Sequence, residues 1–366
     1  MTATMFGAPL SLYSGKARAY LDWKSIPYTE RLPVDPVFTE EVVPQVGRPV
    51  IPVIRLEDGT VLQDTTVIID HFEAASSVPS VYPAGPRQRL AALLLECFGD
   101  EWLVIPAMHY RWHYNEEWVY GEFGKAALPG GTAEEQYAVG KQRGSMFKGF
   151  VPMLGITETT VPAIEASYEA LLSELDAHFA LNEHLFGTRP SIGDYGLIGP
   201  LYAHNYRDPK SGEIMRRLAP NVAAWVERMI APNPLAGEFL TDDEVPATLF
   251  PILQRMMREQ LPYLQKVAQL LGEWASGNKE AEVPRAIGMV DFSIEGVTGQ
   301  RAALPFSLWM LQRGLDYLAS LESDDRFAAE AMLRECDGEA FIEFEMPVRL
   351  NFEDFRLDHS DLVSNS

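Results

Sequence analysis

The chain has 366 residues, 47% of them hydrophobic and 11% aromatic, which allows two or three domains with a sizeable core and excludes a largely disordered chain. Its 52 acidic and 30 basic residues give a net charge of −22, which argues against nucleic acid or an anionic membrane as a partner. The sequence has no apolar run near the ~18 residues of a membrane-spanning helix and no secretory signal pattern, so we expect a cytoplasmic protein. Its two cysteines, Cys97 and Cys336, form no CxxC pair, and we expect neither a disulfide scaffold nor a thiol-redox site.

The first 80 or so residues alternate short strands with helices. In chain order we expect a strand at Thr2–Gly7, a helix from Ser14 through Leu21, a strand at Tyr28–Val34, a β-hairpin over 50–62 that turns at Asp58-Gly59, and a helix from Asp64 or Thr65. Pro52 lies inside the first strand of this hairpin. Because a proline cannot donate to the ladder, it indicates an edge, a bulge or a cis bond.

A connector rich in proline and glycine, residues 78–87, separates this unit from a helical region. Apolar residues recur there with helical spacing from Ile164 to Phe179 and again from Leu218 to Met229. Between these two stretches, Ser191-Ile192-Gly193-Asp194 resembles a capping box with aspartate at its fourth position. We therefore predict a helical domain after the connector.

The last third of the chain follows Pro232-Asn233-Pro234 and mixes helices with a few strands. We expect a long helix over 249–271, a strand at Val290–Ile294, a helix at Leu304–Leu318 and a final strand at Ile342–Met346. From residue 322 to residue 361 the chain has 13 acidic and 4 basic residues, a net charge of −9. Much of the negative charge therefore lies in this tail.

Several short motifs follow one another along the first 230 residues. The motifs are Lys16-Ala17-Arg18, Ser25-Ile26-Pro27-Tyr28, Ile51-Pro52-Val53-Ile54, Asp58-Gly59, Val61-Leu62-Gln63-Asp64-Thr65, and Ser191 to Asp194 with Tyr195 and Leu197. In their order and spacing, the sequence resembles cytosolic glutathione S-transferases over residues 1–230. No single motif is specific, but their order and separation are. The last third lies outside the common pattern, as in a subgroup with a long C-terminal extension.

The resemblance implies an α/β plus all-α fold. It comprises a thioredoxin-like glutathione-binding domain at 1–80, an all-helical domain at 88–232, and a helix-rich extension with a few strands at 233–366. The resemblance also implies a homodimeric transferase, active in detoxification, that uses glutathione as co-substrate and a hydrophobic electrophile as partner, with no metal. Two alternatives stay open. One is other chemistry on the same thiolate (ether cleavage, reductive dehalogenation or isomerisation), and the other is a non-enzymatic relative that serves as an interaction protein.

A glutathione-dependent enzyme must favour the thiolate, because a free thiol with a pKa of about 8.5 is mostly protonated at neutral pH. A hydroxyl donor and a helix N-terminus both favour the anion. The loop from Gly7 into the first helix carries the hydroxyls of Ser11, Tyr13 and Ser14. By resemblance to serine-type members, counting back from Lys16, the donor is Ser11. Ser14 is more simply the helix N-cap, and Tyr13 is either a core residue or an alternative donor.

The resemblance also assigns the peptide part of glutathione. Ile51, the residue before Pro52, would pair its backbone with the cysteinyl part. At the start of the following helix, where free N–H groups suit a carboxylate, Thr65 would hold the γ-glutamyl carboxylate and Asp64 its amine. Arg48 is the nearest cation in the sequence for the glycyl carboxylate. Plainer interpretations are also open: Ile51 would belong to an edge strand, Asp64 and Thr65 would be helix caps, and Arg48 would be a solvated loop arginine.

An unusual density of aromatic residues marks the start of the helical domain, where the family has its electrophile pocket. We expect Trp102, His109, Tyr110 and His113 to line that pocket, although packing in a core or a subunit interface explains them equally well. His109 and His113 are four residues apart and two glutamates follow them, a spacing that also suits a metal. No third ligand is in view, and we predict no metal.

Overall fold

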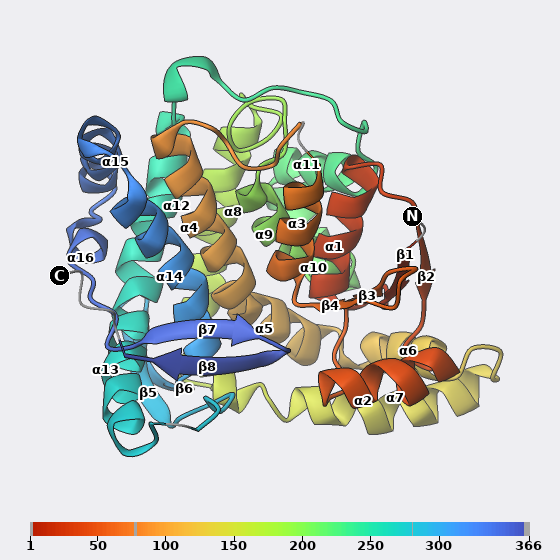
Figure 1. The fold of residues 1–366 in the computed structure, drawn as a ribbon. Coiled ribbons are helices and arrows are strands. Elements are labelled where there is room, and N and C mark those ends of the chain that lie inside the picture. Colours follow the sequence, from red (N-terminus) through yellow and green to blue (C-terminus); the bar gives the residue numbers. More distant parts are fainter. Residues whose placement is uncertain (1–2, 77–78, 280, 362–366) are drawn as a thin grey trace.

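The computed structural model describes residues 3–76, 79–279 and 281–361. Its first unit is a four-stranded mixed sheet with strand order β2-β1-β3-β4, accompanied by helices (Figure 1). β1 pairs with β2 in parallel, and the pairs β1–β3 and β3–β4 are antiparallel. This is the expected thioredoxin-like domain. Its elements are β1 (Ala3–Phe6), α1 (Leu12–Trp23), β2 (Tyr28–Arg31), a π-helical turn (Phe38–Val42), α2 (Val43–Val46), β3 (Val53–Arg55), β4 (Val61–Gln63) and α3 (Thr65–Ala75).

The hairpin forms where the sequence predicts it. β3 and β4 are joined through Asp58-Gly59, where Gly59 takes the positive φ of 89° that a tight turn requires. Pro52 directly precedes β3, so it removes no ladder donor, and the Ile51–Pro52 peptide bond is cis. The strand expected at Thr2–Gly7 is found as β1, with Thr2 outside the described residues, and the strand expected at Tyr28–Val34 ends earlier, at Arg31.

The start of the first helix differs from the prediction. Helix α1 begins at Leu12 and its N-cap is Ser11, whose Oγ accepts a hydrogen bond from the Ser14 N–H (3.2 Å). The prediction of Ser14 as the N-cap is therefore wrong. Ser14 lies in the first turn of the helix, fully buried, and its Oγ accepts from the Ala8 N–H (3.3 Å). Both serines suit a cap by type, and only the path of the preceding loop decides between them.

The next region is helical, as predicted. The predicted capping box is confirmed, because the Ser191 side chain accepts from the Asp194 N–H and the Asp194 carboxylate accepts from the Ser191 N–H (2.8 Å). Asp194 also accepts from the Leu185 N–H and from Trp225 Nε1, so the motif fixes α9 against α11. The helices are α4 (Pro86–Glu101), α5 (Val104–Tyr114), α6 (Glu116–Ala127), α7 (Ala133–Lys148), α8 (Val161–Phe179), α9 (Ile192–Ala203), α10 (Pro209–Leu218) and α11 (Pro220–Ile230).

The extension forms further helices and two hairpins. The expected long helix, the strand at 290–294 and the helix at 304–318 are confirmed, whereas the strand expected at Ile342–Met346 is wrong. Ile342 ends a short helix that buries Phe341 in the core, and strand pairing begins only at Arg349. The elements are α12 (Phe250–Arg255), a π-helical turn (Met256–Gln260), α13 (Leu261–Gly277), β5 (Met289–Ile294), β6 (Val297–Ala302), α14 (Pro305–Ser320), α15 (Ser323–Glu335), α16 (Glu339–Ile342), β7 (Arg349–Glu353) and β8 (Arg356–Ser360).

The extension packs along α4 and shares its core (Figure 1). Helices α14 and α15 both contact α4, and buried residues from all three regions form one hydrophobic cluster. Trp102, just after α4, lies 6.0 Å from both Tyr263 and Phe292 of the extension, measured between ring centroids. The buried guanidinium of Arg301 lies over the Trp102 ring (5.2 Å) and donates to the Glu101 carbonyl (2.8 Å). None of the helices in the described ranges is both long enough and apolar enough to cross a membrane.

Candidate functional site

The sheet register brings the predicted glutathione-binding segments together at one end of the N-terminal sheet. Phe6 of β1 pairs with Val53 of β3, and Val53 pairs with Gln63 of β4. The residues that follow β1, precede β3 and follow β4 therefore meet at one edge. These segments are the loop into α1 with Ser11, the Ile51–Pro52 peptide, and Asp64-Thr65 at the start of α3.

The three candidate hydroxyls differ in their hydrogen-bond roles. Ser11 is partly exposed, and its Oγ accepts from the helix; within the described part of the chain no acceptor is found for its own proton. Ser14 is fully buried. Tyr13 donates to the backbone carbonyl of Asp100 (3.1 Å), and burial, together with the nearby charge of Glu101, raises the pKa of Tyr13 well above its usual value. Ser11 is thus the hydroxyl that can still donate at this helix N-terminus.

Asp64 and Thr65 form the start of α3 in an uncommon backbone conformation. Asp64 has a φ of 74°, which is rare for a residue other than glycine, and its carboxylate accepts from the Thr66 N–H (2.8 Å). Burial raises the pKa of Asp64, while the charge of Lys16 opposes this effect. Thr65 is only 2% exposed. The pair places a carboxylate beside the N–H groups of a helix start, which is a suitable arrangement for an amino-acid head group.

Arg48 and Ile51 lie near the C-terminal hairpin. Arg48 is exposed, and its Nη2 donates to the backbone carbonyl of Phe355, between β7 and β8 (3.4 Å). Ile51 and Phe355 both pack against a small buried cluster of the N-terminal domain. The candidate site therefore includes a contact with the extension, a segment more than 300 residues away in the sequence.

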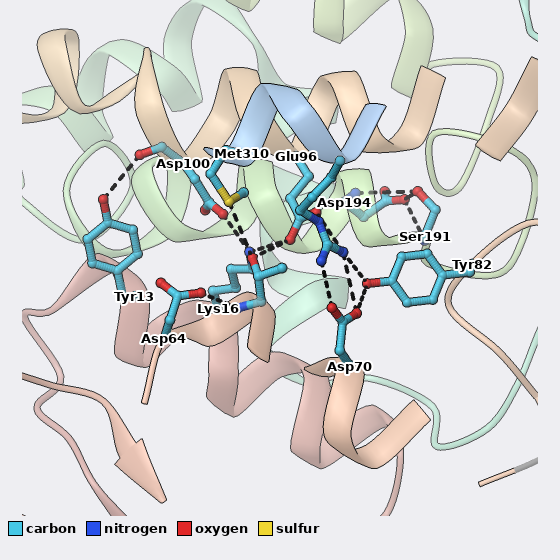
Figure 2. A network of polar contacts seen from close by, with 12 residues as sticks. Tyr13, Lys16, Asp64, Asp70, Tyr82, Glu96, Asp100, Ser191, Asp194 and Met310 are labelled. Atoms are coloured by element: carbon cyan, nitrogen blue, oxygen red, sulfur yellow. Dashed lines mark hydrogen bonds and ion pairs between the residues drawn. The ribbon is translucent and has the colours of Figure 1, made fainter. Parts of the chain in front are cut away.

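A buried ion cluster lies behind this site (Figure 2). The sequence motifs did not indicate it. Lys16 Nζ lies 2.5 Å from Asp100 Oδ2 and 2.8 Å from Glu96 Oε1. Thr66 Oγ1 lies 3.2 Å from the same nitrogen and donates to Glu96 (2.8 Å). Figure 2 shows the Asp64 carboxylate beside Lys16. The cluster therefore connects α1, α3 and α4 next to the predicted glutathione-binding residues.

Burial and the charge of Lys16 act in opposite directions on the pKa values of the carboxyl groups in and beside this cluster. Burial alone lowers the pKa of Lys16, but the charges of Asp100 and Glu96 outweigh burial and hold the pKa above its usual value. Burial raises the pKa of Asp100 well above its usual value, with Lys16 in opposition. Burial also raises the pKa of Glu101, with a hydrogen bond from Ser307 in opposition. The lysine stays charged, and both carboxyl groups hold their protons to a higher pH than in water.

Three of the four residues expected to line an electrophile pocket are core residues. Trp102 and Tyr110 are 2% and 1% exposed, and the extension covers Trp102. His109 is fully buried, with Nε2 within hydrogen-bond distance of Glu165 (2.8 Å), and only His113 is exposed. Core packing, the plainer interpretation, accounts for the three buried residues. Across the described ranges no group of three or more His, Cys, Asp or Glu side chains is placed to hold a metal ion.

The molecule thus combines a thioredoxin-like domain, an all-helical domain and a site at the sheet edge where three segments meet. Residues 5–80 match the N-terminal domain of glutathione S-transferases, and residues 158–228 match their C-terminal domain. These two matches support membership of the glutathione S-transferase family. A search among curated proteins found no match.

Several solved structures are similar to part of this chain. A beta-etherase from Sphingobium sp. strain SYK-6 is 17% identical with a TM-score of 0.45, over 64% of this chain and 96% of that chain. A glutathione S-transferase from Rhodospirillum rubrum F11 is 15% identical with a TM-score of 0.41, over 67% and 96%. A glutathione S-transferase from Methylobacterium radiotolerans JCM 2831, in complex with glutathione sulfonate, is 19% identical with a TM-score of 0.37, over 67% and 100%.

Proposed function

We propose that this protein is a glutathione-dependent transferase in which a bound thiolate attacks a hydrophobic electrophile. The observation that carries the proposal is the free hydroxyl of Ser11 at the N-terminus of α1. It lies at the same sheet edge as the cis Ile51–Pro52 peptide and the Asp64-Thr65 helix start. Membership of the family supports glutathione as the co-substrate.

Each residue of the sheet edge has a role in this proposal. Ser11 donates a hydrogen bond to the thiolate, and the positive end of α1 adds to the stabilisation of the anion. Ile51 pairs its backbone with the cysteinyl part, while Thr65 receives the γ-glutamyl carboxylate and Asp64 the γ-glutamyl amine. Arg48 lies at the glycyl end. The rate comes from a preformed thiolate held in contact with the electrophile.

Tyr13 and Ser14 are not donors in this proposal, because their hydroxyl groups are already engaged or buried. Calorimetric titration with glutathione, together with the ultraviolet absorbance of the bound thiolate, tests this. Wild type is expected to bind glutathione and to lower the thiol pKa below its ordinary value of about 8.5. Ser11→Ala should still bind but raise the pKa of the bound thiol, whereas the control Tyr13→Phe should leave that pKa unchanged.

Asp64→Ala, checked for folding by circular dichroism, should abolish glutathione binding, because the γ-glutamyl amine loses its carboxylate. Absence of binding to wild type at millimolar glutathione contradicts the whole proposal. A thiol pKa that moves in Tyr13→Phe and not in Ser11→Ala transfers the donor role to Tyr13.

The family resemblance extends the proposal to a homodimeric, cytoplasmic enzyme of detoxification. Light scattering of the purified protein tests the dimer. Turnover of aryl halides, β-aryl ethers and isomerisable substrates separates conjugation from ether cleavage, reductive dehalogenation and isomerisation. A protein that binds glutathione but turns over none of these substrates would instead fit the non-enzymatic alternative.

A further inference from the structure

The tip of the hairpin β7–β8 reaches back to the N-terminal domain (Figure 1). Its strands pair from Arg349 with Ser360 to Glu353 with Arg356, which leaves Asp354 and Phe355 as a two-residue turn. The Phe355 carbonyl accepts from Arg48, and its side chain packs on the N-terminal cluster against which Ile51 also packs. The tip of the hairpin, residues 353–356, therefore contacts Arg48 and packs on the cluster that Ile51 also contacts.

The residue at the second turn position is an unusual choice. Asp354 and Phe355 have φ values of 48° and 66°, and a two-residue hairpin turn of this kind favours glycine in second place. The other hairpin of the extension follows that preference, since β5 and β6 turn at Glu295-Gly296 with φ values of 44° and 74°. A bulky side chain at positive φ is disfavoured. The turn therefore gives no reason for Phe355, whereas its contact with the N-terminal domain does.

A cavity of about 350 Å³ lies between the hairpin tip and the N-terminal domain. Its residues come from β4, α3, β7 and the turn. Gln63 and Val67 of this lining flank Asp64-Thr65 in the sequence, so the cavity adjoins the proposed glutathione site. Its lining consists of Val61, Leu62, Gln63, Val67, Phe352, Glu353, Asp354 and Phe355.

The charge of this lining is negative. Glu353 and Asp354 contribute two carboxylates. Arg356, the cation of the hairpin tip, is not part of the lining and lies near Glu282 instead (3.8 Å). Arg48 is close by, but one of its donors is used by the Phe355 carbonyl. A ligand end with a free carboxylate would therefore meet two carboxylates, and Arg48 as a cation with one donor already engaged.

We propose that the hairpin tip discriminates among thiol co-substrates by the charge at their C-terminal end, the end that lies near Arg48. The cavity favours a peptide thiol whose C-terminal end is neutral or cationic over one that ends in a free carboxylate, as glutathione does. Glu353 and Asp354 set this preference by charge, and Phe355 sets it by holding the tip in place. This inference rests on the proposed glutathione site.

The test compares the affinity for glutathione with that for its C-terminal carboxamide, by calorimetry at low salt. Wild type should bind the amide more tightly, by about three- to tenfold, as expected for partly exposed charges. In the double variant Glu353→Gln, Asp354→Asn this ratio should fall to about one, chiefly through tighter binding of glutathione. Asparagine tolerates the positive φ of the turn, so the hairpin is retained. Asp358→Asn removes one negative charge from the same hairpin outside the cavity lining, and it should leave the ratio unchanged.

Phe355→Gly tests the tip itself. Glycine suits the turn better, so the hairpin should persist, but without its packed side chain the tip is released and the ratio should again fall to about one. Equal binding of both thiols to wild type, or an unchanged ratio in the double variant or in Phe355→Gly, overturns the inference while leaving the proposed function intact. If neither thiol binds to wild type, both the inference and the proposed function are overturned.

Discussion

Lys16 and Asp100 form an ion pair inside the protein, with 2.5 Å between Nζ and Oδ2 and side chains that are 0% and 4% exposed. Lys16 belongs to α1 of the thioredoxin-like domain and Asp100 to α4 of the helical domain, so the pair lies across the contact between the two. Glu96, 2.8 Å from the same nitrogen, makes this a cluster of one cation and two carboxylates. The cluster is therefore far more sensitive to loss of the lysine than to loss of one carboxylate.

Lys16→Met is expected to lower the free energy of unfolding by about 3–5 kcal/mol, because it removes the cation paired with the buried Asp100 and leaves the buried Glu96 with the more distant Arg313 (3.9 Å). Asp100→Asn, in which Lys16 keeps Glu96, should cost only about 1 kcal/mol. Urea unfolding near neutral pH measures both values. Equal losses in the two variants would contradict this account of the cluster.

The cost of Lys16→Met should also depend on pH. The folded-state pKa of Asp100 is already raised, and loss of the cation raises it further. A carboxyl group with a raised folded pKa favours the folded state below that pKa, and this contribution is lost as the pH rises through it. The variant should therefore recover stability relative to wild type as the pH is lowered from neutral. A difference in the free energy of unfolding that does not change with pH would contradict the raised pKa.

His178 is the basis of a second pH prediction. It is fully buried on α8, with Nδ1 2.7 Å from Thr248 Oγ1 and Nε2 3.3 Å from the His184 carbonyl, two contacts that a neutral ring satisfies. Burial lowers the pKa of His178 to about 4. The unfolded chain, with a histidine pKa of about 6.5, takes up the proton first as the pH falls. Stability from this group is therefore complete above about pH 6.5 and is lost toward pH 4.

Between about pH 7 and about pH 5, wild type should lose roughly 1–2 kcal/mol more of its free energy of unfolding than His178→Gln does. The carboxyl groups titrate in both proteins, so their effects cancel in this comparison. His113→Gln, a change at an exposed histidine, serves as the control and should lose as much as wild type. An equal loss in His178→Gln would show that His178 does not carry the effect.

Two capping boxes found among the described residues differ in burial and offer a further prediction. Thr132 and Glu135 form the box of α7 at the surface, and Ser191 and Asp194 form the box of α9 in the core. Thr132→Ala should cost about 0.5–1 kcal/mol, and Ser191→Ala about 2 kcal/mol, because the second leaves buried polar groups unpaired. Asp194→Ala should cost about 3–5 kcal/mol, since Trp225 also loses its acceptor. Thermal or urea unfolding gives the ranking, and equal values for the two serine and threonine variants would contradict it.

The features predicted correctly from the sequence are those that neighbouring residues determine. The Asp58-Gly59 turn and the Ser191 to Asp194 box each need only a few adjacent residues, and both are confirmed. The prediction of Ser14 as N-cap failed because the cap depends on how the loop before α1 folds back, with the Ala8 N–H donating to Ser14. Alternating residues at 342–346 predicted a strand, but burial of Phe341 on a short helix decides that segment.

The parts of the site that come from distant segments could not be predicted. Lys16 was identified only as part of a family motif, and its acidic partners Glu96 and Asp100 lie 80 and 84 residues further along the chain. The contact between Arg48 and Phe355 spans 307 residues. Tertiary structure alone brings such residues together, and a single sequence contains no periodicity that reports it.

The last prediction concerns the extension, which Arg313 of α14 joins to the first two domains. Arg313 Nη1 lies 2.6 Å from Asp70 of α3, and Nη2 donates to Tyr82 Oη (2.8 Å) and lies 3.9 Å from Glu96 of α4. Arg313→Met should cost about 1–2 kcal/mol, a value reduced for the partial exposure of Asp70. Arg349→Met, the control, breaks an exposed pair with Asp316 inside the extension and should cost under about 1 kcal/mol.

Truncation of the chain after residue 232 should destabilise the protein much more than either substitution does. It would uncover the face of α4 that α14 and α15 cover, and with it Trp102, which now packs on Tyr263 and Phe292. Apolar surface of this kind is expected to cause aggregation instead of cooperative folding, because a large exposed patch favours association. Size-exclusion chromatography and urea unfolding of the shortened chain measure this. A monodisperse protein with a single cooperative transition would mean that the first two domains fold without the extension, and the large apolar contact described for α4 would then contribute little to their stability.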